Sequence, residues 1–330
     1  MCLLYHLSAP NTSRYFPANP TIHATSRFPF SAPPVVPGSC QVKSSPGFAK
    51  SFEPNPLHRL MGKGAMPMGL NAIPIGQDRV LCLTGHGSRL LLPANDLSLT
   101  PELVFSGGME FPLTHYFLNH VRPGHRVIDI GANIGYFSVL LGRLIGPEGK
   151  LWAYEPYPEL RGFLFDNLSI NYVHDRTVVL AKAAYSSETR LTLNASLRYM
   201  GNSSIREPTE EYRRHYADEF KQIVVDAEAL DSRVDEFGTI DFAKMDIEGG
   251  EYHALRGMER LLPDKVRHLV FELNRSMLAD DWEPFCDLLR RYSRDYSKRF
   301  SLLSSDGFPL PVELEDLLAM TGYPYVLMHD

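Results

Sequence analysis

Residues 126–137, with the sequence RVIDIGANIGYF, constrain the fold more strongly than any other stretch of the chain. A run rich in β-branched residues ends at Asp129, and glycines follow at Gly131 and Gly135. An apolar segment with helical spacing then continues to Ile145. This order predicts a strand, a tight loop and a helix. The stretch therefore has the form of the opening of a nucleotide-binding βαβ unit.

The loop of this unit suits a ligand with an anionic or polar part. Gly131 and Gly135 lack a Cβ atom, so the backbone can adopt conformations closed to other residues and approach a ligand closely. The free amide groups of the helix that begins near Ile134 would favour a carboxylate or a phosphate. We therefore expect residues 131–135 to border a bound small molecule.

A second predicted strand, residues 150–154, ends in a carboxylate at Glu155, 24 residues after Gly131. In the dinucleotide fold an acid at roughly 20 residues binds the ribose diol. The middle glycine that admits a pyrophosphate is replaced by Asn133, which disfavours a dinucleotide. Many α/β proteins carry an Asp-x-Gly turn after a strand, but Glu155 in this place favours a mononucleoside cofactor such as S-adenosylmethionine.

Composition narrows the class of protein. The 330 residues suffice for one large α/β domain with appendages. The net charge of −6 and the lack of a basic block disfavour nucleic acid as a partner. The four cysteines are far apart, which indicates neither a disulfide framework nor a zinc site and favours a reducing compartment. No stretch reaches the roughly 18 apolar residues of a membrane span, so we expect a soluble, cytoplasmic protein with no membrane partner.

The N-terminal segment differs from the rest. Residues 1–56 contain ten of the 25 prolines, four basic residues and one acid, Glu53. So much proline leaves no helical or strand period, and we expect residues 1–60 to form a disordered tail. The scarcity of acids resembles a transit peptide, but the prolines interrupt any amphipathic helix. A non-catalytic tail, or an over-extended start with Met61 or Met66 as the true one, is the preferred interpretation.

Residues 61–124 are expected to cap one end of the sheet. Residues 79–83 and 89–92 predict a hairpin with a glycine-bearing loop. Residues 101–121 predict a strand or loop that leads into one helix. Glu110, at the start of that helix, could face the cofactor pocket, although a carboxylate stabilised by the helix dipole is the favoured role.

The region after Glu155 predicts a helix over residues 158–172 and a third strand over 177–181. Residues 190–193 suggest an extra edge strand. The polar run 194–216 is an insertion whose residues 202–204 lie in a loop. The sequence is equally compatible with an insertion that contacts the acceptor and with an ordinary surface loop.

A second informative stretch, residues 240–251, predicts a strand, a carboxylate-rich turn and a helix that continues to Leu261. Asp246 and Glu248 would lie beyond the carboxyl end of the strand, where open parallel sheets bind ligands. Glu251 also suits the first turn of a helix. Lys244, between apolar neighbours in the strand, needs a partner if it is buried.

Taken together, residues 127–137 and 242–251 resemble the paired signature of FkbM-type S-adenosylmethionine-dependent methyltransferases. Leu230-Asp231 before the second motif and residues 270–272 after it also fit. The resemblance covers roughly residues 105–290.

This resemblance implies an α/β class I methyltransferase fold over residues 125–330. Such a fold is a Rossmann-like three-layer sandwich around a seven-stranded, mostly parallel sheet whose last strand is antiparallel. Residues 300–303 and 323–328 would form the final strands, and Pro324 would be tolerable only at a sheet edge.

The resemblance also implies roles for single residues. Asp129, Gly131, Asn133 and Gly135 would hold the amino-acid part of S-adenosylmethionine, and Glu155 its ribose hydroxyls. The segment Lys182-Ala183 would border its adenine.

Methyl transfer, usually to a hydroxyl oxygen, requires the acceptor to be aligned and deprotonated. Asp246 or Glu248 is expected to be the general base, with a metal-ligand role less favoured and no metal predicted. His253 and His115 are rival bases, although a lone histidine is more often structural. The acceptor would be a small molecule or a glycan, and a homo-oligomer is compatible with the sequence.

Two other classes of function stay open. A nicotinamide oxidoreductase would use the same βαβ opening, but the third glycine of its fingerprint is absent. A catalytically silent methyltransferase fold is also compatible, although the intact acidic turn argues against it.

Overall fold

The central sheet of the computed structural model, which describes residues 71–330, has eight strands. In sheet order they are β13 (Pro309–Val312), β12 (Arg299–Leu303), β14 (Tyr325–His329), β11 (Val266–Glu272), β10 (Ile240–Met245), β4 (Arg126–Ile130), β5 (Lys150–Tyr154) and β6 (Thr177–Leu180). The predicted tail, residues 1–60, and both alternative starts lie outside the described residues.

The pairing of these strands fixes where a ligand can bind. Strands β11, β10, β4, β5 and β6 run parallel to one another. The chain builds outward from β4 through β5 to β6 and then returns to β10 on the other side of β4. This reversal is a topological switch point, and ligands of open α/β sheets bind beyond the carboxyl ends of the strands there.

The end of the sheet differs in part from the expected arrangement. β14 is antiparallel to both β11 and β12, as expected for the last strand. However, β14 lies between them rather than at an edge, and β13 adds one antiparallel strand beyond the seven expected. Pro324 is tolerated because it immediately precedes β14, where its carbonyl oxygen accepts the Leu273 amide at 2.9 Å.

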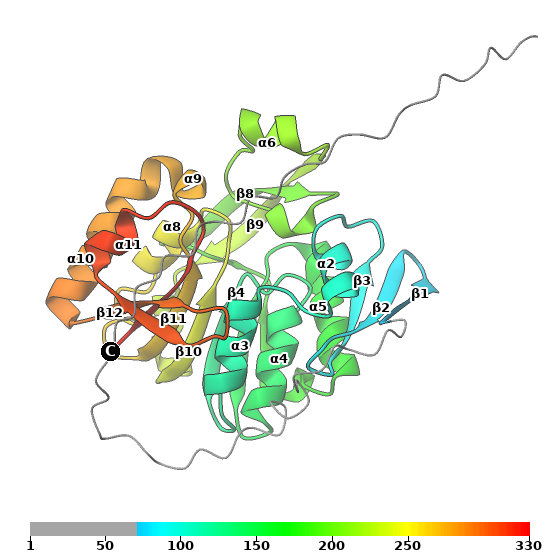
Figure 1. The fold of residues 1–330 in the computed structure, drawn as a ribbon, viewed down its shortest axis with the longest axis horizontal. Helices are drawn as coiled ribbons and strands as arrows, with labels where there is room; N and C mark the ends of the chain where they lie inside the picture. The colour runs from blue at the N-terminus through cyan, green and yellow to red at the C-terminus, as the bar shows by residue number, and fades with distance from the viewer. Residues whose placement is uncertain (1–70) are drawn as a thin grey trace, which may run out of the picture. The chain divides into compact units, whose positions relative to one another are not determined.

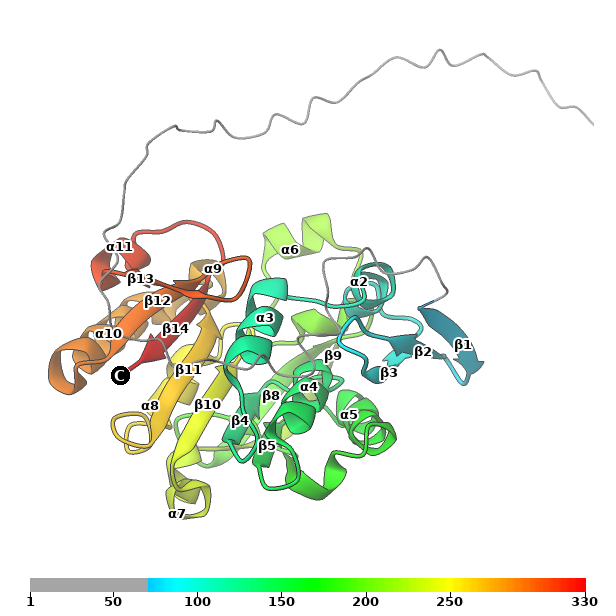
Figure 2. The ribbon, with the colours of Figure 1, turned by 60° about the horizontal axis from the view of Figure 1, so that its bottom comes forward.

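Successive side chains along each strand point to opposite faces of the sheet, which divides the core into two layers. Val127 and Leu151 pack into one hydrophobic cluster, while their neighbours Ile128 and Trp152 pack into the other. The first layer holds α3 (Phe111–His120), α4 (Tyr136–Ile145) and α5 (Pro158–Ile170), which lie together in Figures 1 and 2. The second holds α7 (Val234–Phe237), α8 (Glu251–Arg256), α10 (Trp282–Tyr296) and α11 (Leu314–Leu318).

The segment before β4 forms a three-stranded meander and two helices. These are β1 (Ala72–Gly76), β2 (Arg79–Leu83), β3 (Arg89–Pro93), α2 (Leu99–Ser106) and α3. Antiparallel pairing of β2 with β3 confirms the predicted hairpin. The helix expected in residues 101–121 is α3, whose N-cap is Glu110, but the strand or loop expected before it was wrong: that part is the helix α2, which ends at Gly107 with φ of 67°.

A second small sheet lies beside the carboxyl ends of the central strands. It contains β7 (Ala183–Ala184), β9 (Phe220–Glu228) and β8 (Thr189–Ser196), with α6 (Glu210–His215) between β8 and β9 (Figure 1). The edge strand expected at residues 190–193 is therefore β8, which pairs with β9 and not with the central sheet.

The remaining elements are short. They are α9 (Arg275–Leu278) and the 3₁₀ turns η1 (His174–Arg176), η2 (Met200–Asn202), η3 (Leu230–Arg233) and η4 (Ala279–Asp281). The helix expected to reach Leu261 ends at Arg256, and turns follow it. In the described part of the chain, no helix has the length and apolar character needed to cross a bilayer.

Candidate active site

The segments singled out in the sequence meet at the carboxyl ends of three adjacent strands. Residues 131–135 follow β4, Glu155 follows β5, and Asp246 and Glu248 follow β10. Together they border a cleft of about 640 Å³. We name it the Glu155 cavity after the carboxylate in its lining. Ala183, predicted to border adenine, also lines this cavity.

Glu155 is held in a fixed orientation. Its side chain is 5% exposed, and its two oxygens accept the backbone amides of Asn133 and Tyr157, each at 2.8 Å. Burial raises the pKa of Glu155 to about 7, although the two amide hydrogen bonds act in the opposite direction. A buried carboxylate at this position retains lone pairs for a hydroxyl donor.

The glycine loop is shaped by protein contacts. Gly131 has φ of 80°, and a Cβ atom there would overlap the carbonyl oxygen of Asp246. At Gly135, with φ of 92°, a Cβ atom would lie 2.7 Å from Leu164 Cδ1 of α5. Both positions therefore require glycine because another part of the chain, rather than a ligand, approaches the backbone closely there.

The amide groups of this loop also differ from expectation. Gly131 and Ala132 donate to the Tyr154 carbonyl, and Gly135 donates to the Ala132 carbonyl. Asn133, with φ of 52°, donates its amide to Glu155, and its side chain accepts the amide of the next residue at 2.7 Å. All five amides from 131 to 135 thus have protein acceptors, so the loop offers a ligand carbonyl oxygens and side chains rather than amide donors.

Asp129 lies beneath the cavity and is not among its lining residues. Ser138 donates a hydrogen bond of 2.6 Å to its carboxylate, and Lys244 Nζ lies 3.6 Å from the other oxygen. Lys244 is 3% exposed, donates to the Gly131 carbonyl at 3.0 Å and lies 3.4 Å from Asp246. Lys244 thus has the partners that its burial required, and Asp129 is one of them.

The acidic turn after β10 connects three cavities. Glu248 lines the Glu155 cavity, a second cavity of about 1120 Å³ and a third of about 1380 Å³. We name the second and third after Glu110 and Glu272, which line them. Asp246 lines only the first two. Glu248 is therefore the carboxylate at the junction of all three spaces.

The backbone of this turn is constrained. Glu248 has a left-handed φ of 53°, an uncommon conformation for a residue with a side chain. The Ser204 hydroxyl donates a hydrogen bond of 2.6 Å to the Glu248 carbonyl. Burial and the neighbouring carboxylates raise the pKa of Glu248 well above its ordinary value. The predicted insertion, through Ser204, therefore fixes the acidic turn.

The other candidate acids and bases contact neighbouring protein groups rather than the cavities. Glu251 lines none of the three cavities, and its Oε1 accepts the Ile247 amide at 3.3 Å. His253 Nε2 lies 3.3 Å from Asp281, and His115 Nδ1 lies 2.9 Å from the Ser305 carbonyl. Neither histidine is among the residues lining these cavities. No group of three or more His, Cys, Asp or Glu side chains within residues 71–330 is arranged to hold a metal ion.

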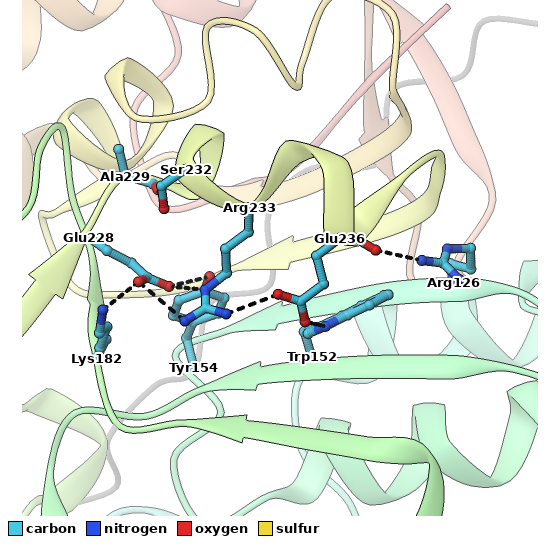
Figure 3. A network of polar contacts seen from close by, with 9 residues as sticks. All are labelled: Arg126, Trp152, Tyr154, Lys182, Glu228, Ala229, Ser232, Arg233 and Glu236. Atoms are coloured by element: carbon cyan, nitrogen blue, oxygen red, sulfur yellow. Dashed lines mark hydrogen bonds and ion pairs between the residues drawn. The ribbon is translucent and has the colours of Figure 1, made fainter.

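Sequence reasoning missed the polar network behind the Glu155 cavity, shown in Figure 3. Glu228, at the end of β9, accepts hydrogen bonds from Lys182 Nζ at 2.6 Å and from the Tyr154 hydroxyl at 3.0 Å, and it pairs with Arg233. Lys182 and Tyr154 line the cavity. The network therefore pairs Lys182 with a buried carboxylate at the end of the cavity where Ala183 lies.

The strand order, the antiparallel β14 and the cleft at the switch point define the class I S-adenosylmethionine-dependent methyltransferase fold. The chain belongs to the FkbM methyltransferase family: the model of the methyltransferase FkbM domain matches residues 129–300, slightly more than half of the chain.

Two relatives illustrate the likeness. Methyltransferase sdnD of Sordaria araneosa is 28% identical over 181 residues, which cover 48% of this chain and 66% of that protein. A protein-L-isoaspartate O-methyltransferase of Aeropyrum pernix is 45% identical over 47 residues, which cover 14% of this chain and 18% of that protein. The chain spans less than two thirds of the length of either relative.

Among solved structures, a SAM-dependent O-methyltransferase from Thermotoga maritima matches with a TM-score of 0.37 and 14% identity. The match covers 76% of this chain and 77% of that one.

Proposed function

We propose that this protein transfers a methyl group from S-adenosylmethionine to a hydroxyl oxygen of a small molecule or a glycan. The observation that carries the proposal is the position of Glu248, the carboxylate residue that lines all three cavities. A base at that junction can face a cofactor on one side and an acceptor on another.

The Glu155 cavity fits the nucleoside part of the cofactor. Glu155 offers a buried carboxylate to the two ribose hydroxyls, and Leu160, Ala183 and Leu193 supply apolar wall for the adenine. When bound, S-adenosylmethionine supplies an electrophilic methyl carbon, so the chain has to align the acceptor oxygen and take its proton.

Glu248 is a better candidate for the base than Asp246. Asp246 lies 3.4 Å from the Lys244 ammonium, so its carboxylate is already engaged in an ion pair. Glu248 has a raised pKa and is the one of the two that lines the Glu272 cavity. Asp246 then acts mainly by holding Lys244 at the base of the loop after β4.

The Glu272 cavity suits an acceptor that carries hydroxyl groups. Its wall combines side-chain hydrogen-bonding groups with aromatic rings, among them Asn202, Asn274, Tyr212, Tyr216 and Tyr323. Amide and hydroxyl groups bind alcohols through hydrogen bonds, and aromatic faces cover apolar parts of a ring.

Calorimetry and methyl-transfer assays test this proposal. Binding of S-adenosylhomocysteine supports methyl transfer, binding of NAD instead supports an oxidoreductase, and binding of neither supports a silent fold. With a deuterium-labelled methyl donor, mass spectrometry of hydroxylated acceptors should show one labelled methyl group on oxygen. Labelling found on nitrogen or carbon alone would contradict the hydroxyl acceptor.

A further inference from the structure

Glu110 is a carboxylate that the mechanism above does not use, although it lines a cavity that adjoins the nucleoside site. The Glu110 cavity shares Gly131, Asn133, Asp246 and Glu248 with the Glu155 cavity, so one ligand can extend from one space into the other. If the nucleoside lies against Glu155, the rest of the cofactor points toward Glu110.

The Glu110 side chain is incompletely satisfied. Its Oε2 atom is buried and has no hydrogen-bond partner among residues 71–330, while the Tyr325 hydroxyl bonds to its carboxyl group. A buried acceptor without a partner is unfavourable, because it has lost its hydrogen bonds to water and gained none in the protein. Glu110 is the N-cap residue of α3, as expected from the sequence, but it has a left-handed φ of 45° and its side chain accepts no capping hydrogen bond from the helix.

The charges around the Glu110 cavity favour a cation. Of its lining residues in the described chain, four are acids, namely Glu102, Glu110, Asp246 and Glu248, and Lys244 is the one base. Lys244 is already occupied by Asp129, Asp246 and the Gly131 carbonyl. The cavity therefore has an excess of acceptors over donors.

We infer that the Glu110 carboxylate binds the α-ammonium group in the amino-acid part of the cofactor, with Oε2 as the acceptor. The inference rests on the proposed function, because it takes the nucleoside to lie in the Glu155 cavity. An ammonium group brings three donors and a positive charge to an oxygen that has no hydrogen-bond donor among the described residues. Glu110 is thus a cofactor-binding residue on α3, outside both motifs of the family signature.

Binding of this kind should release a proton. In the free protein, burial and the charge of Asp246 raise the pKa of Glu110 to about 8, while Lys244 and Tyr325 lower it and Glu272 raises it. Glu102 on α2 and Tyr136 on α4 also face Glu110. At pH 7 the carboxyl group is mostly protonated, and a bound ammonium favours its ionised form.

The test compares S-adenosylhomocysteine with 5′-methylthioadenosine, which has the same nucleoside and sulfur but no amino-acid part. Glu110→Gln should weaken binding of S-adenosylhomocysteine about 10- to 100-fold, the range of a charged hydrogen bond, and leave methylthioadenosine within about twofold. Calorimetry of the wild type at pH 7 in buffers of different ionisation enthalpy should show release of about one proton with S-adenosylhomocysteine and none with methylthioadenosine.

The control variant is Glu148→Gln, which removes an exposed acid that lines none of the three cavities. It should leave the affinity for S-adenosylhomocysteine within about threefold. Three results would each overturn the inference while the proposed function stands. They are equal affinities of the wild type and Glu110→Gln for S-adenosylhomocysteine, equal losses of affinity for both ligands in Glu110→Gln, and no proton release by the wild type. Failure of the wild type to bind either ligand would overturn both. The proton measurement needs no variant, so it decides even if Glu110→Gln does not fold.

Discussion

Lys244 Nζ lies 3.0 Å from the carbonyl oxygen of Gly131, so a buried cation on β10 holds the loop that follows β4. The register of the two strands creates this contact, because Lys244 is paired with Asp129 across the β10–β4 ladder. The two motifs, more than 100 residues apart in sequence, are thereby joined at the base of the site.

Replacing Lys244 with Met should destabilise the protein by about 3–5 kcal/mol, because Asp129 would keep a buried charge without a cation. Urea unfolding measures the change. The exposed variant Lys221→Met should change stability by less than about 0.5 kcal/mol. Adding Asp129→Asn to Lys244→Met should restore part of the loss, and a double variant no more stable than the single one would refute the pairing.

Gly131→Ala and Gly124→Ala form a matched pair. Both glycines have a positive φ, 80° and 84°, but a Cβ atom at Gly131 would overlap the Asp246 carbonyl oxygen, whereas none of the surrounding atoms lies within 4 Å at Gly124. Gly124→Ala should cost about 1 kcal/mol from backbone strain alone. Gly131→Ala should cost at least about 2 kcal/mol more in the same unfolding experiment. Equal costs would mean that the acidic turn can move aside.

Local patterns in the sequence were sufficient to predict the centre of the fold. Buried parallel strands appear in the sequence as short, mostly apolar runs, and the runs of β4, β5 and β10 are each followed by a glycine turn or an acid. That is why β4, β5 and β10, together with Glu155 and Glu248, were predicted at the places where the structure has them.

Contacts that depend on the three-dimensional arrangement were not predicted. Glu228 was missed because β9, its strand, is half exposed and belongs to a separate small sheet. Glu110 was expected at the start of a helix and is the N-cap of α3, but its place in the lining of a cavity depends on the sharp turn at Gly107, which separates α2 from α3. The burial of Asp129 beside Lys244 was not predicted, because it depends on the register between β4 and β10.

Glu155→Gln should reduce discrimination between adenosine and 2′-deoxyadenosine. A carboxylate that accepts a ribose hydroxyl contributes about 1.5–3 kcal/mol, and the ligand without that hydroxyl cannot use it. Competition against S-adenosylhomocysteine should show adenosine preferred by about tenfold or more in the wild type and by about twofold in the variant. An unchanged preference would place the ribose elsewhere.

The contribution of Glu251 to the stability of the protein should fall as the pH rises from 5 to 8. Glu251 is 3% exposed, and burial raises its pKa to about 7 from the ordinary 4.5. Between these values the folded state binds more protons than the unfolded state, so the free energy of unfolding decreases with pH. Glu251→Gln should be more stable than the wild type at pH 8, by on the order of 2 kcal/mol, and similar at pH 5. Thermal unfolding across this range checks the prediction, and parallel curves for the two proteins would contradict it.

Glu248→Gln should lower kcat about 10²- to 10⁴-fold, the usual contribution of a general base, with little change in the affinity for S-adenosylhomocysteine. Because the pKa of Glu248 is raised, kcat of the wild type should increase with pH as this group ionises, and the variant should lack that dependence. Asp246→Asn should lower kcat less, since Asp246 is engaged by Lys244 at 3.4 Å. Glu207→Gln, an exposed acid that lines the Glu272 cavity, should stay within about twofold of the wild type. A larger loss of kcat in Asp246→Asn than in Glu248→Gln, with cofactor affinity intact in both, would assign the base to Asp246 instead.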